Sequence, residues 1–121
     1  MSSVTWHCLH HRELDTATLY ELLALRTQVF VVEQNCPYLE TDGQDLIGDT
    51  CHLLARDESG LMGYLRLLDP QHMEGEVVIG RVLTAERARG SGLGHRLMER
   101  ALVECGQRWP GAPVYLSAQA H

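Results

Sequence analysis

The sequence predicts one domain of the α/β (α+β) class, and three observations lead to this prediction. Short apolar runs rich in valine and leucine are typical of β-strands. Two longer segments place their apolar residues three or four positions apart, as amphipathic helices do. The chain has 121 residues, 45% of them apolar, which is enough for one hydrophobic core and short for two.

The N-terminal half is predicted to contain a strand, a helix and a long loop. Residues 4–10 alternate weakly between apolar and polar and are predicted to form a strand. Residues 15–32 follow a helical pattern, which begins either at a capping Asp15 or at a capping box that starts at Thr18. Residues 34–48 contain one proline and two glycines, and loops of this length in a small domain are often functional.

The C-terminal half is predicted to contain four more strands and one helix. In chain order these are strands 50–56, 61–68 and 76–84, a helix over 93–106, and a strand over 112–117. The turn at 57–60 is typical of a hairpin between the first two of these strands.

The glycine-rich turn Arg89-Gly90-Ser91-Gly92-Leu93-Gly94 is the most informative segment, because it joins a predicted strand to a predicted helix. Glycines let the backbone approach a ligand, and the first amides of a helix attract an anion such as a phosphate. The dinucleotide-binding pattern requires a third glycine where this chain has His95, and the phosphate loop of nucleotide hydrolases requires a lysine, which the chain lacks. A turn with a purely structural role is the alternative.

The pattern Arg89-x-x-Gly92-x-Gly94 after a strand resembles the coenzyme-binding motif of the GNAT acetyltransferases. The resemblance extends over residues 82–98, and residues 26–42 resemble the ElaA-like branch of that family. It implies the GNAT acyl-CoA N-acyltransferase fold, a mixed and mostly antiparallel sheet flanked by helices. It also implies acetyl-CoA as cosubstrate and transfer of its acetyl group to a primary amine by direct attack.

Residues 1–121 are expected to form a single N-acetyltransferase domain that is incomplete at its C-terminus. Members of the family usually continue with a further helix and two strands, which carry a tyrosine that often serves as general acid. The chain is therefore expected to be either a fragment of a longer protein or a naturally short one. The alternative function is a fragment that binds CoA without turnover, or that dimerises through an uncovered strand edge.

The residues expected to bind the cofactor belong to one strand edge and one turn. The pantetheine arm can add to the edge of strand 76–84 where strand 112–117 splays away, and the Val82 amide can then polarise the thioester carbonyl. Amides of the glycine-rich turn would hold the pyrophosphate. The expected cofactor-binding residues are Val82, Leu83, Thr84, Arg89, Gly90, Ser91, Gly92, Leu93, Gly94 and His95.

An attacking amine must lose a proton, so a carboxylate or histidine is expected near the thioester. Glu76 is the first candidate, because it shares the predicted strand face of Val78, Gly80 and Val82. Glu33 is the second, at the end of the helix that leads into the long loop. His52 is the third. The alternatives are exposed carboxylates at element ends for the two glutamates, and a buried, hydrogen-bonded side chain for His52.

The long loop is expected to contact the acceptor, because residues 33–49 carry five acids and no basic residue. Its acids, Glu40 and Asp42 among them, would attract a cationic amine. Tyr38 and Phe30 would supply apolar walls. The alternatives are an ordinary solvated loop and two aromatic residues that belong to the core.

Charge and composition exclude several other functions. Residues 1–80 carry 13 acids and four arginines, so a nucleic acid is not expected as a partner. The chain has neither a signal-peptide pattern nor a long apolar segment, so a cytoplasmic protein without membrane contact is expected. The cysteines lack C-x-x-C spacing and are interpreted as small buried side chains, and the histidines lack ligand spacing, so no metal is expected.

Overall fold

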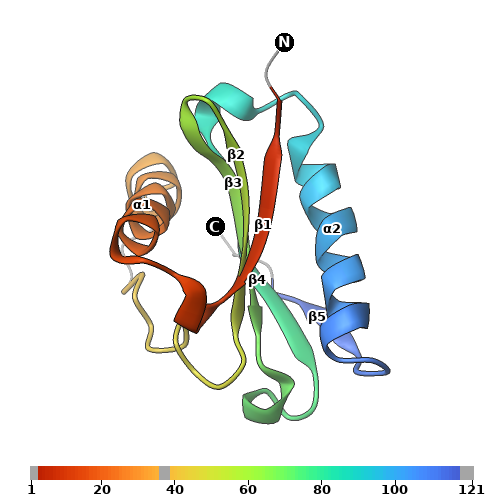
Figure 1. Ribbon diagram of the computed structural model, residues 1–121. Coiled ribbons are helices and arrows are strands. Elements are labelled where there is room, and N and C mark those ends of the chain that lie inside the picture. Colours follow the sequence, from red (N-terminus) through yellow and green to blue (C-terminus); the bar gives the residue numbers. More distant parts are fainter. Residues whose placement is uncertain (1–2, 36–38, 118–121) are drawn as a thin grey trace.

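The protein is built on one five-stranded sheet, seen nearly edge-on in Figure 1, a computed structural model that describes residues 3–35 and 39–117. The strands lie in chain order: β1 (Thr5–His10), β2 (Cys51–Asp57), β3 (Gly60–Leu68), β4 (Val77–Thr84) and β5 (Val114–Leu116). Neighbouring strands from β1 to β4 are antiparallel, and β5 is parallel to β4. The expected mixed, mostly antiparallel sheet is confirmed.

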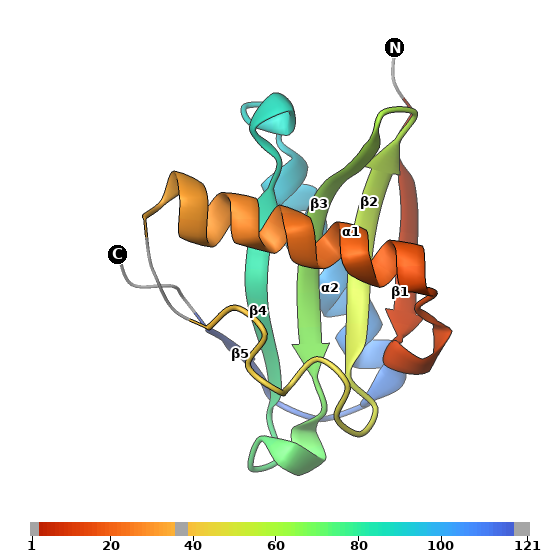
Figure 2. The same cartoon turned by 90° about the vertical axis from the view of Figure 1, so that its left-hand side faces the viewer.

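Two helices cover opposite faces of this sheet. Helix α1 (Thr16–Arg26) continues directly into a π-helical segment, η2 (Thr27–Glu33), and both run across the strands in Figure 2. Asp15 caps α1 by accepting a hydrogen bond from the Thr18 amide at 2.7 Å, which decides between the two predicted caps. Helix α2 (Leu93–Arg108) packs on the other face. No helix within the described residues is both long and apolar enough to cross a membrane.

Three single 3₁₀ turns were not predicted, because one turn is too short to show a periodic pattern. They are η1 (His11–Glu13), η3 (Pro70–His72) and η4 (Glu86–Ala88). Strand β5 is also shorter than the predicted strand over 112–117. Each turn connects elements without changing their order.

The core consists of two apolar clusters, one on each face of the sheet. The α2 side includes Leu53, Leu65, Ile79, Leu93 and Leu97. The α1 side includes Leu22, Phe30, Leu54, Tyr64 and Leu83. Each leucine that is fully buried stabilises the fold by roughly 1.5–3 kcal/mol.

Strand β4 contains a bulge at Arg81, which corrects one prediction about its faces. Its register with β3 shifts between the pairs Leu83↔Tyr64 and Gly80↔Arg66, and Arg81 has φ +52°. An extra residue in one strand reverses the alternation of side chains beyond it. Val82 therefore packs with the α2-side cluster, together with Ile79, and does not share a face with Glu76 and Gly80.

Strand β5 pairs with only the first part of β4. The paired residues run from Val77 to Ile79, and the Ser117 amide adds one hydrogen bond to the Ile79 carbonyl at 2.9 Å. Among the described residues, none pairs with the β5-facing edge of β4 from Gly80 to Thr84. This is the edge to which the pantetheine arm is expected to add.

Candidate active site

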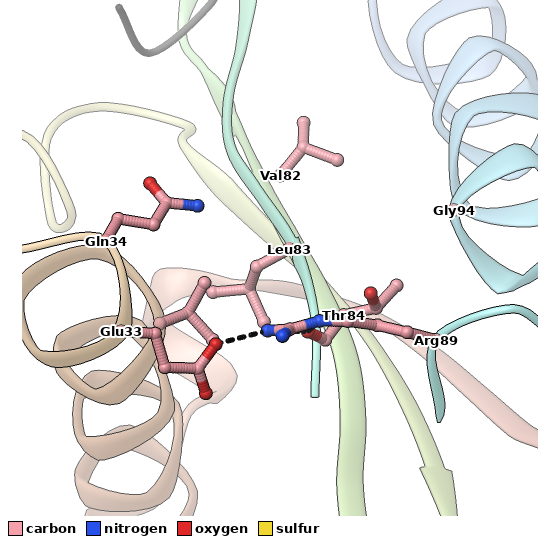
Figure 3. A pocket seen from close by; sticks show the side chains of 8 residues that line it. Glu33, Gln34, Val82, Leu83, Thr84, Arg89 and Gly94 are labelled. Atoms are coloured by element: carbon pink, nitrogen blue, oxygen red, sulfur yellow. Dashed lines mark hydrogen bonds and ion pairs between the residues drawn. The ribbon is translucent and has the colours of Figure 1, made fainter. Parts of the chain in front are cut away.

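The open edge of β4 forms one wall of a pocket of about 450 Å³ (Figure 3). The pocket lies where the end of η2, strand β4, the following turn and the start of α2 meet. It is lined by Val29, Glu33, Gln34, Val82, Leu83, Thr84, Arg89 and Gly94. Segments that are far apart in the sequence thus contribute to one cavity.

Backbone groups of β4 face this pocket. The Thr84 carbonyl accepts hydrogen bonds from Nε and Nη2 of Arg89, at 3.3 and 3.1 Å, so it points to the open edge. In a strand, the N–H and C=O of one residue point to the same edge, and residues two apart share that edge. The backbone groups of Val82 therefore point to the open edge as well.

The glycine-rich turn presents helix amides beside that edge. Gly90 and Gly92 have φ +83° and +80°, a region that side-chain-bearing residues rarely adopt. Gly92 is the N-cap of α2 and no side chain caps the helix, so its first amides are available to a ligand. A Cβ atom added to Gly90, Gly92 or Gly94 would meet no neighbouring atom within 4 Å, so the space beside the turn is open. The Ser91 hydroxyl closes the turn by donating to the Ala88 carbonyl at 2.6 Å.

Glu33 and Arg89 form an ion pair across the pocket. Arg89 Nη2 lies 2.6 Å from Glu33 Oε1, as the dashed line in Figure 3 shows. The pair ties the end of η2 to the turn that precedes α2, over a separation of 56 residues. Of the two predicted catalytic glutamates, Glu33 is the one that lies with the predicted cofactor-binding residues.

Glu76 lies elsewhere. It is exposed, immediately before β4, at the opposite end of the strand from Thr84. It lines a separate hollow of about 340 Å³ together with Val78 and Tyr115. The structure therefore does not bring Glu76 together with the pocket that holds Glu33.

His52, the third candidate, is a buried structural side chain. Its Nε2 lies 2.9 Å from the Asp45 carbonyl, which can only accept, so this nitrogen carries the proton. Its Nδ1 lies 2.5 Å from the Tyr64 hydroxyl. Burial lowers the pKa of His52 to about 4, so the ring is neutral near pH 7. The structure agrees with the alternative interpretation of His52.

The loop acids are held by three arginines that the sequence analysis did not connect with them. Arg26 of α1 donates to Glu40 Oε1 at 2.7 Å and to Asp45 Oδ1 at 2.6 Å, and Arg81 donates to the same Glu40 oxygen at 2.8 Å. Arg66 donates to Asp42 at 2.6 and 3.0 Å and to Asp45 at 2.9 Å. These six side chains carry equal numbers of positive and negative charges, so the loop is not a simple acidic surface.

This network is largely buried. Arg26 is fully buried, and Glu40 is 6% exposed. Burial alone would raise the pKa of Asp42, but its hydrogen bonds and charge interactions with Arg66 outweigh burial and lower the pKa to about 2. Asp45 also has a lowered pKa, because Arg26 and Arg66 outweigh its burial. A solvated loop, one of the predicted alternatives, does not describe Glu40 or Asp45.

Of the two aromatic residues expected near the acceptor, Phe30 is within the described residues and Tyr38 is not. Phe30 is 3% exposed and packs in the α1-side cluster, so it belongs to the core and does not line the pocket. Tyr38 lies outside the described residues.

Val29 and Gln34 line the pocket but were not predicted to do so. The position of Glu33 at the helix end was the available signal for both, because Val29 lies about one turn before it and Gln34 directly follows it.

The chain is similar to known proteins of one family. The model of the Acetyltransferase (GNAT) family matches residues 16–121. Protein ElaA of Escherichia coli strain K12 is 49% identical over 118 residues, which cover 98% of this chain and 77% of ElaA.

Solved structures show the same fold. A crystal structure of an acyl-CoA N-acyltransferase from Pseudomonas aeruginosa is 60% identical, with a TM-score of 0.94 over 98% of this chain and 82% of that one. The crystal structure of Escherichia coli ElaA gives 49% identity and a TM-score of 0.92, over 98% of this chain and 80% of that one. A predicted acetyltransferase from Clostridium acetobutylicum, solved with acetyl-CoA, is 14% identical with a TM-score of 0.70, over 97% of this chain and 82% of that one. On the family match and the identity to ElaA, this chain belongs to the GNAT acetyltransferase family.

Proposed function

We propose that this chain binds acetyl-CoA in the pocket beside β4 and transfers the acetyl group to a primary amine by direct attack. One observation carries the proposal: the open edge of β4 and the uncapped amides of α2 line the same cavity. The fold supports it, because the Clostridium acetobutylicum protein of the same fold was solved with acetyl-CoA.

Two parts of the pocket suit two parts of coenzyme A. The pyrophosphate would accept hydrogen bonds from the amides between Gly90 and His95, where the helix also contributes roughly half a positive charge. The pantetheine arm contains amide groups and would pair with the backbone of Val82 and Thr84, as an added strand does. The Arg89 guanidinium donates hydrogen bonds to the Thr84 carbonyl. When the pantetheine arm pairs with that carbonyl, the guanidinium would turn toward the anionic end of the coenzyme.

The reaction would proceed at the thioester. The neutral amine attacks the thioester carbonyl carbon, and the Val82 amide stabilises the negative charge on the carbonyl oxygen. The tetrahedral intermediate then releases the CoA thiolate and leaves an amide on the acceptor. A base must first remove the ammonium proton, directly or through a water molecule. Glu33 is the better placed base, because it lines the pocket and Glu76 does not.

Two measurements test this function. Acetyl-CoA consumption with a panel of primary amines should show turnover, and calorimetric titration with CoA should show saturable binding. Binding without turnover on any amine would support the alternative, a chain that binds CoA without catalysis. Absence of CoA binding would contradict the proposal. Light scattering on the same samples tests association through the exposed strand β5, whose Tyr115 is 56% exposed.

A further inference from the structure

Two cysteines that are 43 residues apart in the sequence meet on the α2 side of the sheet. Cys8 lies on β1 opposite Leu53, and Cys51 lies on β2 opposite His10, so the two cysteines are diagonal neighbours on one face. The Cys51 thiol donates a hydrogen bond to the Asp49 carbonyl at 3.2 Å. Neither cysteine forms a disulfide.

The guanidinium of Arg108 holds this pair from the end of α2. Its Nη1 lies 3.2 Å from Cys51 Sγ, and its Nη2 donates to the Cys8 carbonyl at 2.9 Å. Glu104 fixes the same side chain by accepting from its Nε at 3.0 Å. The positive charge is therefore directed at the sulfur of Cys51.

These contacts make the two sulfurs chemically different. Interaction with the Cys8 thiol and the charge of Arg108 lower the pKa of Cys51, although its burial and the charges of Asp49 and Glu104 oppose this. Interaction with Cys51, together with burial, raises the pKa of Cys8. Cys51, the sulfur that faces Arg108, is therefore the one that ionises more readily. By contrast, burial raises the pKa of Cys105 to about 11.

We propose that Cys8 and Cys51 form a redox-sensitive thiol pair, which a peroxide oxidises to a disulfide between β1 and β2. The Cys51 thiolate attacks the peroxide O–O bond and becomes a sulfenic acid, with release of hydroxide. The Cys8 sulfur then displaces the sulfenic hydroxyl group as water and forms the S–S bond. Two thiols lose two electrons and two protons, and one hydrogen peroxide is reduced to two water molecules.

The surroundings permit this chemistry. Strand β1 is an edge strand and Cys8 is partly exposed, whereas Cys51 is 1% exposed, so the peroxide approaches from the Cys8 side. An edge strand is held by one neighbour and can adjust to the short Cα separation that a disulfide requires. Among the described residues, no cluster of three or more His, Cys, Asp or Glu side chains that could hold a metal ion includes this pair.

The first test is a thiol count on the intact protein. Brief treatment with dilute hydrogen peroxide should reduce the number of titratable thiols from four to two, and a reductant should restore all four. In Cys36→Ser, trypsin should then yield peptides 1–12 and 27–56 joined by one disulfide, because cleavage follows arginine. The joined peptides should lack two hydrogen atoms relative to the sum of the reduced peptides.

The second test separates the role of Arg108 from simple proximity of the sulfurs. Arg108→Gln removes the positive charge, so disulfide formation should slow by roughly threefold to tenfold. Arg100→Gln, on the same helix but stacked over Trp6, should leave the rate unchanged. Retention of all four thiols, oxidation of Cys105 in preference to the pair, or equal rates in both arginine variants would overturn the proposal. None of these readouts depends on acetyl transfer.

Discussion

Gly94→Asp tests the pocket directly, because it places a carboxylate where the pyrophosphate of CoA is proposed to lie. Gly94 lines the pocket and is the second residue of α2. A Cβ atom added there would meet no atom of a neighbouring element within 4 Å, so the position has room for a side chain to begin. Gly92 is a less suitable position, because its φ of +80° would strain any other residue.

The substitution should change stability and affinity in opposite directions. An aspartate in the first turn interacts favourably with the helix dipole, which stabilises the fold by about 0.3–1 kcal/mol, and replacing glycine in a helix adds slightly to this. Two unit charges about 4 Å apart repel by about 1 kcal/mol in water and about 4 kcal/mol at an effective dielectric constant of about 20. Gly94 is partly exposed, so a value near 2 kcal/mol applies, or roughly thirtyfold weaker CoA binding.

Calorimetric titration with CoA and thermal melting measure both effects. Gly94→Asn adds a side chain of similar size without the charge and should lose much less affinity. Gly106→Asp adds the same charge to an open position nearer the C-terminal end of α2 and should bind CoA normally. Raising the salt concentration should reduce the difference between the Asp and Asn variants, because the repulsion is screened over about 10 Å. Unchanged affinity in Gly94→Asp, or an equal loss in Gly106→Asp, would refute the proposed site.

Three further predictions concern single carboxylates. Glu33→Gln should lower kcat by at least about tenfold with little change in CoA affinity. The control variant Glu76→Gln should keep most of the activity. Equal kcat values for the two variants would exclude Glu33 as the base. Glu40→Gln should reduce the free energy of unfolding by about 3 kcal/mol in urea titration, because two buried arginines lose the negative charge of their shared acceptor. The exposed Glu74→Gln should change it by less than about 0.5 kcal/mol. Because the pKa of Asp42 is lowered to about 2 in the folded protein, its stabilisation is present above about pH 4 and is lost as the pH falls toward 2. The free energy of unfolding of the wild type should therefore fall by about 1–2 kcal/mol more than that of Asp42→Asn between these pH values, as measured by urea titration. An equal fall in the two proteins would contradict this.

The secondary structure and the cofactor side of the site could be predicted because their signals are local. Periodicity identified all five strands and both helices, and Asp15 was one of the two caps considered. The glycine-rich turn was recognised because glycine is the residue that readily adopts a positive φ, as Gly90 and Gly92 do. The edge of β4 was expected to be open where strand 112–117 splays away, although the residues of β5 give no signal of where its pairing with β4 ends.

The acidic loop could not be predicted correctly, because its partners come from distant elements. Glu40 is 14 residues from Arg26 and 41 residues from Arg81. One signal was available: Arg26 interrupts the apolar face of α1, and a charged residue in such a position is buried only when it is paired. The bulge at Arg81 gave no local signal, and it reversed the predicted faces of β4 beyond Gly80.

The buried charge network and the open strand edge are physically connected through Arg81. A positive φ at a residue other than glycine costs about 1–3 kcal/mol, so the surrounding structure must hold the bulge. The Arg81 side chain is held by Glu40 at 2.8 Å and by Asp42 at 3.3 Å, and these acids are themselves fixed by Arg26 and Arg66. The bulge in turn directs the Val82 side chain into the α2-side cluster. The acids that the sequence presents as a possible surface for a cationic acceptor thus anchor the backbone conformation from which the open edge of β4 begins.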